Sequence, residues 1–230
     1  MEKKYELTDE TIEVGGKTLR RIRALRDLGD VKKGDLGGYI EKEDNLSHEG
    51  DCWVDGDAKV YGYAKIFDGA CISGSATVCD DAQVYGHAEV SGDAYIYDHA
   101  KIYDDAKVYD RAVIYVNAKV CGFAKVFGKA RIYHDAIISE HAHVYENAEV
   151  FDNATISHFA SAYDNARIFG KAKVCGFAEI YDGAHVSEKA KVGGRAKISG
   201  NARVFGGALV CENAKVTGNT KVSGNDTVLR

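Results

Sequence analysis

The sequence predicts an all-β chain, a parallel β-helix with three strands in each coil, from three regularities. Val or Ile occupies every sixth position from Val54 to Val228, and only Ala162 breaks this series. Ala stands two residues before each of these positions from Ala58 to Ala214. The residue after each Val or Ile repeats its character every eighteen residues, as two aromatics and a small residue. One coil therefore takes eighteen residues, and the stretch makes about ten coils stacked at the interstrand spacing.

Residues 1–50 do not follow the period, and they predict a small capping module. Glu10–Val14 and Lys17–Leu25 are two strand-like runs around Gly15-Gly16, a pattern typical of a β-hairpin. The open first coil of a solenoid exposes unpaired strand edges and therefore needs a cap. We divide the chain into an N-terminal capping module, residues 1–50, and a parallel β-helix, residues 51–230.

Each six-residue repeat predicts a short strand followed by a sharp corner. Ala and the Val or Ile two residues later point to the same side of an extended strand, so both face the core. Gly, Asp and Asn dominate the last two positions of the repeat. These residues adopt left-handed or turn backbone readily, which gives the corner. A narrow core of this kind has no room for a cavity, so we expect any function to lie on faces, edges or ends.

Two columns of outward aromatic residues predict ring ladders on two of the three faces. One ladder comprises Tyr97, Tyr115, Tyr133, Phe151 and Phe169, and the other Tyr109, Phe127, Tyr145, Tyr163 and Tyr181. The third face carries small residues in the same coils: Cys121, Ser139, Ser157, Cys175 and Gly193. Stacked rings stabilise a sheet, whereas an exposed apolar stripe on a monomer usually marks an interface. The pattern fits both a purely stabilising stack and a binding surface.

One edge is the candidate site, because four successive corners hold rings where other corners hold Asn, Asp or Gly. These corners are Phe123, His141, Phe159 and Phe177. His143 lies two residues after His141, and His158 is expected to stack one coil above Glu140. A solvated turn histidine is the alternative interpretation. The candidate binding or interface residues are Phe123, His141, His143, Tyr145, His158, Phe159, Ser161, Tyr163 and Phe177, with Tyr109, Phe127 and Tyr181 beside them.

Composition narrows the partners and the compartment. The net charge of −5, with both signs interspersed, gives no basic footprint for nucleic acid. No apolar run approaches the roughly 20 residues of a membrane span, and the segment after Met1 lacks a signal-peptide core. The six cysteines show neither CxxC nor zinc spacing, which predicts free thiols. We expect a cytoplasmic protein without a metal site, a nucleic-acid partner or a membrane partner.

The Ala-x-(Val/Ile) tract resembles the hexapeptide-repeat superfamily of left-handed parallel β-helices, which includes many trimeric acyltransferases. The preceding segment, GGYIEKEDNLSHEGDCWV, resembles uncharacterised bacterial and bacteriophage hexapeptide-repeat proteins that carry transferase labels. This resemblance implies a left-handed coil, whereas parallel crossovers are usually right-handed. In the acyltransferases Gly or Asp commonly follows the aliphatic residue directly, but here an aromatic residue, Ser or Cys intervenes.

Three functions remain open at this point. We expect a non-catalytic scaffold or binding protein that self-associates as a dimer or trimer and needs no cofactor; the resemblance implies a phage or prophage origin. The first alternative is an acyltransferase that uses a CoA thioester, with His141 or His158 as the base. Enzymes resembling this tract usually interrupt the helix with a loop and append a C-terminal segment, and the tract shows neither. The second alternative is carbohydrate or small-ligand binding on the ladders.

Overall fold

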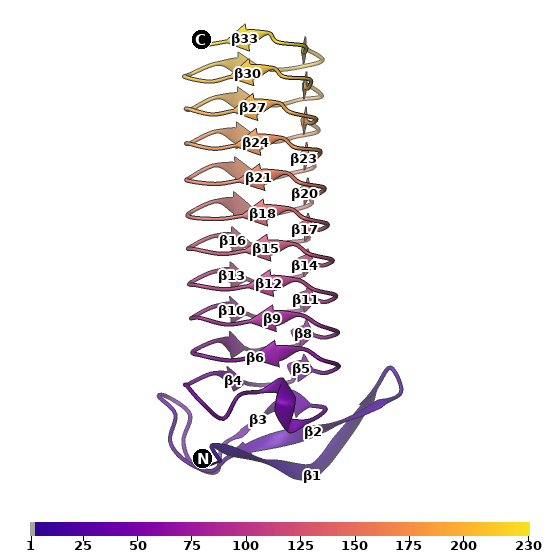
Figure 1. The fold of residues 1–230 in the computed structure, drawn as a ribbon, viewed down its shortest axis with the longest axis vertical. Coiled ribbons are helices and arrows are strands. Elements are labelled where there is room, and N and C mark those ends of the chain that lie inside the picture. The colour runs from indigo at the N-terminus through magenta and orange to yellow at the C-terminus, as the bar shows by residue number, and fades with distance from the viewer. Residues whose placement is uncertain (1–2) are drawn as a thin grey trace.

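The computed structural model describes residues 3–230 and begins with an antiparallel hairpin (Figure 1). Strands β1 (Tyr5–Val14) and β2 (Lys17–Ala24) pair across Gly15 and Gly16. Both glycines have positive φ, 57° and 77°, which matches the twist that a two-residue hairpin requires. The predicted hairpin is confirmed, and its first strand begins earlier than the sequence pattern suggests.

Strand β3 (Leu36–Ile40) joins the hairpin to the rod, because it pairs antiparallel with β2 and parallel with β5 (Lys59–Val60). A 3-10 turn, η1 (Glu43–Asn45), follows, and Leu46 then bridges to Ile66. Parallel stacking therefore starts in an irregular first coil, ahead of the regular six-residue period.

The remaining strands are two residues long, and every coil contributes one strand to each of three sheets. Sheet 1 continues from β5 through β8 (Thr77–Val78), β11 (Tyr95–Ile96), β14 (Val113–Ile114), β17 (Arg131–Ile132), β20 (Glu149–Val150), β23 (Arg167–Ile168), β26 (His185–Val186), β29 (Arg203–Val204) and β32 (Lys221–Val222). Sheet 2 comprises β6 (Lys65–Ile66), β9 (Gln83–Val84), β12 (Lys101–Ile102), β15 (Lys119–Val120), β18 (Ile137–Ile138), β21 (Thr155–Ile156), β24 (Lys173–Val174), β27 (Lys191–Val192), β30 (Leu209–Val210) and β33 (Thr227–Val228). Sheet 3 comprises β4 (Trp53–Val54), β7 (Cys71–Ile72), β10 (Glu89–Val90), β13 (Lys107–Val108), β16 (Lys125–Val126), β19 (His143–Val144), β22 (Ser161–Ala162), β25 (Glu179–Ile180), β28 (Lys197–Ile198) and β31 (Lys215–Val216).

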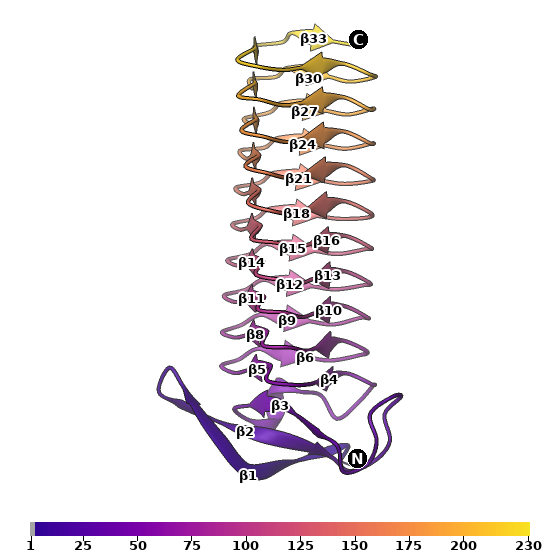
Figure 2. The same cartoon turned by 180° about the vertical axis from the view of Figure 1, so that it is seen from behind.

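The coil is left-handed and keeps a register of eighteen residues. Ile114 pairs with Ile132 and Val126 with Val144, and the Lys125 amide donates to the Ala142 carbonyl at 2.9 Å. In Figure 1 the sheet 2 strands lie in front and run from right to left as the chain climbs, while sheet 3 returns behind them. Figure 2 shows sheet 3 from its own side. The hand agrees with the sequence resemblance and is opposite to that of ordinary parallel crossovers.

The core is a continuous column of the inward Ala and Val or Ile side chains. Val144, Ala148 and Val150 are fully buried, as are their equivalents in neighbouring coils. Ala162, the one position that lost its Val or Ile, is also fully buried and pairs with Val144 and Ile180. The predicted inside and outside of each strand are confirmed.

The corners explain why Asp is so common in the repeat. The first corner residue takes left-handed backbone, with φ of 59° at Asp104 and 58° at Glu140. Its carboxylate accepts the corner amide of the next coil; for example, Asp104 Oδ2 receives the Gly122 N–H at 3.1 Å. Asp therefore both tolerates the backbone and satisfies a donor that the short strands leave free.

Among residues 3–230, no helix is long and apolar enough to cross a membrane.

Candidate functional site

All the predicted site residues lie on sheet 3 or at the corner through which the chain enters it from sheet 2. His143 and Ser161 are the outward residues of β19 and β22, and they are register partners. Tyr109, Phe127, Tyr145, Tyr163 and Tyr181 follow the strands of sheet 3. Phe123, His141, Phe159, Phe177 and His158 occupy the corner that precedes it. The fold thus gathers residues far apart in the sequence into one surface.

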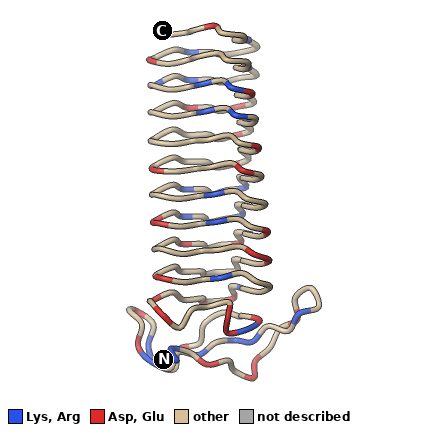
Figure 3. The backbone as a smooth tube through the Cα atoms, in the orientation of Figure 1, with Lys and Arg blue, Asp and Glu red and all other residues tan. Residues whose placement is uncertain are grey.

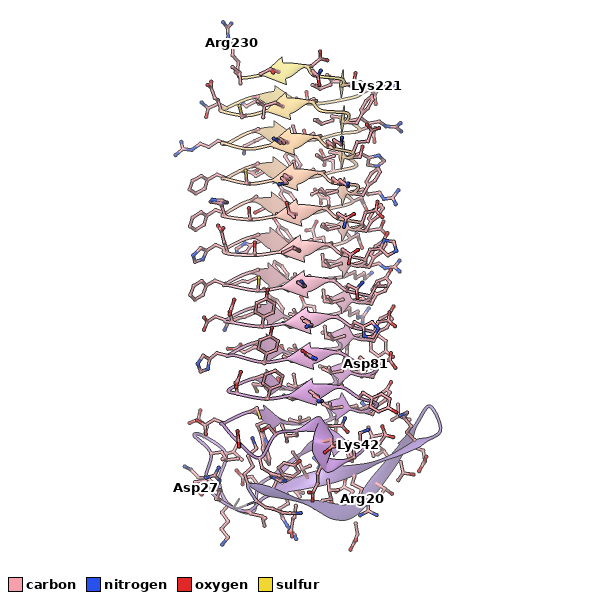
Figure 4. All side chains as sticks on the ribbon, viewed as in Figure 1. Arg20, Asp27, Lys42, Asp81, Lys221 and Arg230 are labelled. Atoms are coloured by element: carbon pink, nitrogen blue, oxygen red, sulfur yellow. The ribbon has the colours of Figure 1, made fainter. Side chains whose placement is uncertain are left out.

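The four rings at this corner form a continuous stack, which we call the corner ladder: Phe123, His141, Phe159 and Phe177. Successive ring centroids are 5.0, 4.7 and 5.1 Å apart, and the rings are nearly parallel. The three Phe residues remain 53, 51 and 55% exposed. Figure 4 shows rings projecting from the left edge of the rod, where sheet 2 turns into sheet 3. The corner ladder is therefore an apolar ridge open to solvent.

The two ladders predicted on the faces are present but more covered than the corner ladder. Tyr109, Phe127 and Tyr145 stack at centroid distances of 4.8 Å, and the stack continues to Tyr181. The ladder that contains Tyr115 and Tyr133 has comparable centroid spacing. Rings in both ladders are half-buried, because each ring covers its neighbour. Stacking and shielding of the sheet therefore bury much of the apolar surface of these rings, which stabilises the sheet without any partner.

Between the corner ladder and the ladder of Tyr109 runs a column of polar side chains along the middle of sheet 3. Glu179 accepts hydrogen bonds from Tyr163 Oη at 3.3 Å and from Lys197 Nζ at 3.1 Å. Half-burial and the neighbouring Lys125 ammonium lower the pKa of His143, so its imidazole is neutral near pH 7. The centre of sheet 3 can therefore offer a neutral imidazole beside the Ser161 hydroxyl.

His158 and His141 lie at the same corner but in different surroundings. His158 Nδ1 is 3.3 Å from Glu140 Oε2 and 3.1 Å from Ser157 Oγ, as the expected stacking on Glu140 requires. The His141 ring is held between two Phe rings and makes no hydrogen bond within residues 3–230. A general base needs both an orienting partner and shelter from water. Glu140 supplies an orienting partner for His158, but both side chains are more than half exposed, so the pair is not sheltered from water.

A shallow hollow of about 460 Å³ lies beside the lower half of the corner ladder. Its lining includes Cys121 and Ser139 on the sheet 2 side and Phe123 and His141 on the other. It exists because the column that carries Phe67, Tyr85 and Tyr103 in lower coils changes to small residues from Cys121 onward. The short stack of those three rings was not predicted from the sequence.

The sequence also did not indicate the groove at the corner between sheets 1 and 2, which has a volume of about 970 Å³. Asp81, labelled in Figure 4, and Asn117 line one side, and Lys101 and Lys119 line the other. The only sequence signal for this groove is a column of lysines beside a column of turn residues, each repeating every eighteen positions. Figure 3 shows that both charge signs recur along the whole rod, which hides such a column.

Another buried polar contact ties the capping module to the first coils. The Lys4 side chain is fully buried, and its ammonium donates to the Cys52 carbonyl at 2.8 Å and lies 3.0 Å from Cys52 Sγ. Burial raises the pKa of the Cys52 thiol. All six cysteines are free, and residues 3–230 contain no group of His, Cys, Asp and Glu arranged to hold a metal ion.

Comparisons with known proteins agree with the repeat architecture. A family model described as the YdcK β-solenoid repeat matches residues 196–212. Over 49 residues the chain is 45% identical to a protein of Escherichia coli (strain K12) named "Uncharacterized acetyltransferase YdcK". This match covers 21% of the present chain and only 15% of that relative. These similarities and the parallel β-helix fit a hexapeptide-repeat β-helix family whose members carry transferase names.

Proposed function

We propose that this chain is a non-catalytic β-helical scaffold that binds protein surfaces, including copies of itself, through sheet 3 and the corner ladder. The observation that carries the proposal is the exposure of Phe123, Phe159 and Phe177 at 53, 51 and 55%. A corner on the outside of the coil is formed equally well by Asp105 or Asn213 in the same column. The fold does not require rings there, and exposed apolar ridges usually mark contact sites.

The form of the rod supports this role. The sheets are flat, repetitive and held by backbone hydrogen bonds in every coil, so a ridge of rings keeps one shape. Repetitive apolar surfaces commonly pair with copies of themselves in symmetric oligomers. We extend the proposal to a dimer or trimer. The six free thiols favour a cytoplasmic location, and the resemblance of the segment before Val54 favours a phage or prophage origin.

Light scattering coupled to size exclusion tests the proposal. We expect the unmodified protein to show a mass at least twice 25.0 kDa at high concentration. Replacing Phe123, Phe159 and Phe177 together by Ser should lower that mass without changing the circular dichroism spectrum. Tyr63→Ser is the matched control, because Tyr63 is 70% exposed at a different corner. A monomer mass for the unmodified protein at every concentration would contradict self-association.

A second candidate function, acetyl transfer, is favoured by the printed name of the relative and by the neutral His143 on sheet 3. A CoA thioester would supply the acyl group, and a histidine would take the proton from the acceptor. We expect no release of CoA thiol from acetyl-CoA with amine or sugar acceptors. Turnover that is lost in His141→Ala, His143→Ala or His158→Ala, but kept in His87→Ala, would establish an enzyme instead.

A further inference from the structure

The corner ladder is the apolar middle of a longer column whose ends carry opposite charges. The same corner position holds Asp105 one coil before the ladder and Arg195 one coil after it. We call these six exposed residues the corner column: Asp105, Phe123, His141, Phe159, Phe177 and Arg195. Five steps at the interstrand spacing make the column about 24 Å long.

We propose that two copies of this chain pair edge to edge and antiparallel through the corner column, about a two-fold axis that passes between His141 and Phe159. This inference rests on the self-association proposed above and specifies its surface and orientation. The axis places Asp105 of each copy opposite Arg195 of the other. It also places Phe123 opposite Phe177, so rings meet rings and charges meet opposite charges.

Other arrangements lose this complementarity. A parallel pair puts Asp105 beside Asp105 and Arg195 beside Arg195, which opposes like charges. An antiparallel pair shifted by one coil puts Asp105 opposite Phe177 and breaks both ion pairs. Like-charge contacts and unpaired charges at an interface select against the wrong register. Only one register of the corner column therefore satisfies all six positions.

The residues that flank the corner column follow the same symmetry. Glu140 and His158, already 3.3 Å apart within one chain, lie on either side of the axis. Each copy therefore brings a carboxylate to the other copy's imidazole. On the sheet 2 side, the axis relates Cys121 to Cys175 and Ser139 to Ser157, all small residues.

These small residues leave the hollow of about 460 Å³ beside Phe123 and His141. The rings that the axis brings to this hollow are Phe177 and Phe159 of the second copy. An apolar ring entering a recess lined by a ring and small side chains is the usual form of an interface anchor.

The charged ends of the corner column are not used within the chain. Neither Asp105 nor Arg195 forms an ion pair inside residues 3–230, and the Arg195 guanidinium lies 5.9 Å from the Phe177 ring centroid. Arg195 is thus positioned at the end of the ladder rather than folded toward an acid. A column of six residues buries less than the roughly 800 Å² per partner of a standard interface. We therefore expect a dimer whose population depends on concentration in the micromolar range.

Charge reversal tests the pairing, with sedimentation velocity as the measurement. Asp105→Arg and Arg195→Asp should each weaken dimerisation at least about tenfold, because each creates two like-charge contacts per dimer. An equimolar mixture of the two variants should dimerise again. In that heterodimer, Arg at position 105 meets Asp at 195, and the native Arg195 meets the native Asp105. Native mass spectrometry should show one chain of each kind.

Each outcome decides between the proposals. If the unmodified protein is a monomer throughout, both the self-association and this pairing are wrong. If it is a dimer that either single variant leaves intact, or that mixing fails to restore, the pairing is wrong while self-association stands on another surface. Arg111→Asp, a reversal at an exposed corner between sheets 3 and 1, should leave the dimer unchanged. Circular dichroism of all variants confirms that each retains the β-helix.

Discussion

Val144 illustrates how a single inward residue supports the rod. Its side chain is fully buried between coils, in contact with the column of Val, Ile and Ala. Val144→Asp would bury a carboxylate with no partner, at a cost of several kcal/mol. We expect this variant to yield no soluble protein, whereas Lys125→Asp, one coil away and outward, should fold normally. Soluble, cooperatively unfolding Val144→Asp would show that the assignment of inside and outside is wrong.

The six thiols should differ sharply in reactivity. Cys52 is fully buried, and burial raises the pKa of its thiol, so less thiolate is present at any given pH. We expect Cys52 to be alkylated far more slowly than the partly exposed Cys211 at pH 8. Peptide mass spectrometry over a time course measures both rates. Equal rates in the unmodified protein would contradict the burial.

At the scale of a corner, Val116 is a residue in a backbone conformation that it disfavours. Its φ is 60°, and β-branched residues are rare in the left-handed region. Val116→Gly keeps the amide that donates to Asp98 Oδ2 at 3.2 Å and removes the strain. We expect it to raise the free energy of unfolding by about 1 kcal/mol. Urea denaturation measures this, and Val113→Gly, at the outward strand position of the same repeat, should instead lower stability.

Protonation of His143, the outward residue of β19 in sheet 3, makes the stability of the fold depend on pH. Half-burial lowers its folded-state pKa below the unfolded value of 6.5, so the unfolded chain binds the proton more tightly. Its contribution to stability is therefore complete above the unfolded pKa and is lost as pH falls through the folded pKa. We expect His143→Gln to flatten the fall in melting temperature below pH 6.5. His99→Gln, at an exposed corner, is the control and should leave that fall unchanged.

The regular strands could be predicted from the sequence, whereas the elements whose tertiary contacts depart from the six-residue period could not. A strict repeat of Ala and Val predicts each two-residue strand, and the lag of eighteen residues predicts the ladders. The first coil was missed because Ile40 and Leu46 pair with Val60 and Ile66 at a spacing of twenty residues. The extra length follows Leu46, in a loop whose Cys52 carbonyl is held by Lys4.

The candidate site was only partly predictable for a similar reason. The period places Phe123 and Tyr109 in columns, but it does not say that a corner ring stays exposed while a ring after a strand is half-buried. That difference depends on how far each side chain stands from the sheet. The groove beside Lys101 and Asp81 was missed because lysine and aspartate occur throughout the repeats.

At the scale of the whole molecule, the rod is a stack in which each coil contacts mainly its neighbours, so its length should be adjustable in whole coils. Ile72 and Val90 are register partners, and removing residues 73–90 joins Ile72 to Ser91, the residue that normally follows Val90. Inward positions and outward columns then stay aligned on both sides of the junction. We expect this deletion to give a soluble β-helix.

A deletion of half that length provides the contrast. Removing residues 82–90 joins the corner residue Asp81 to Ser91, so β9 and β10 are both lost with the corner between them. Nine residues are not a multiple of six, so the downstream pattern is out of phase with the repeat. Outward lysines would then have to enter the core, because a shift of phase exchanges the two faces of a strand. We expect loss of soluble protein for this deletion, judged by expression and circular dichroism beside the deletion of 73–90. Equal solubility of the two deletions would show that the β-helix does not have to be shortened by whole coils.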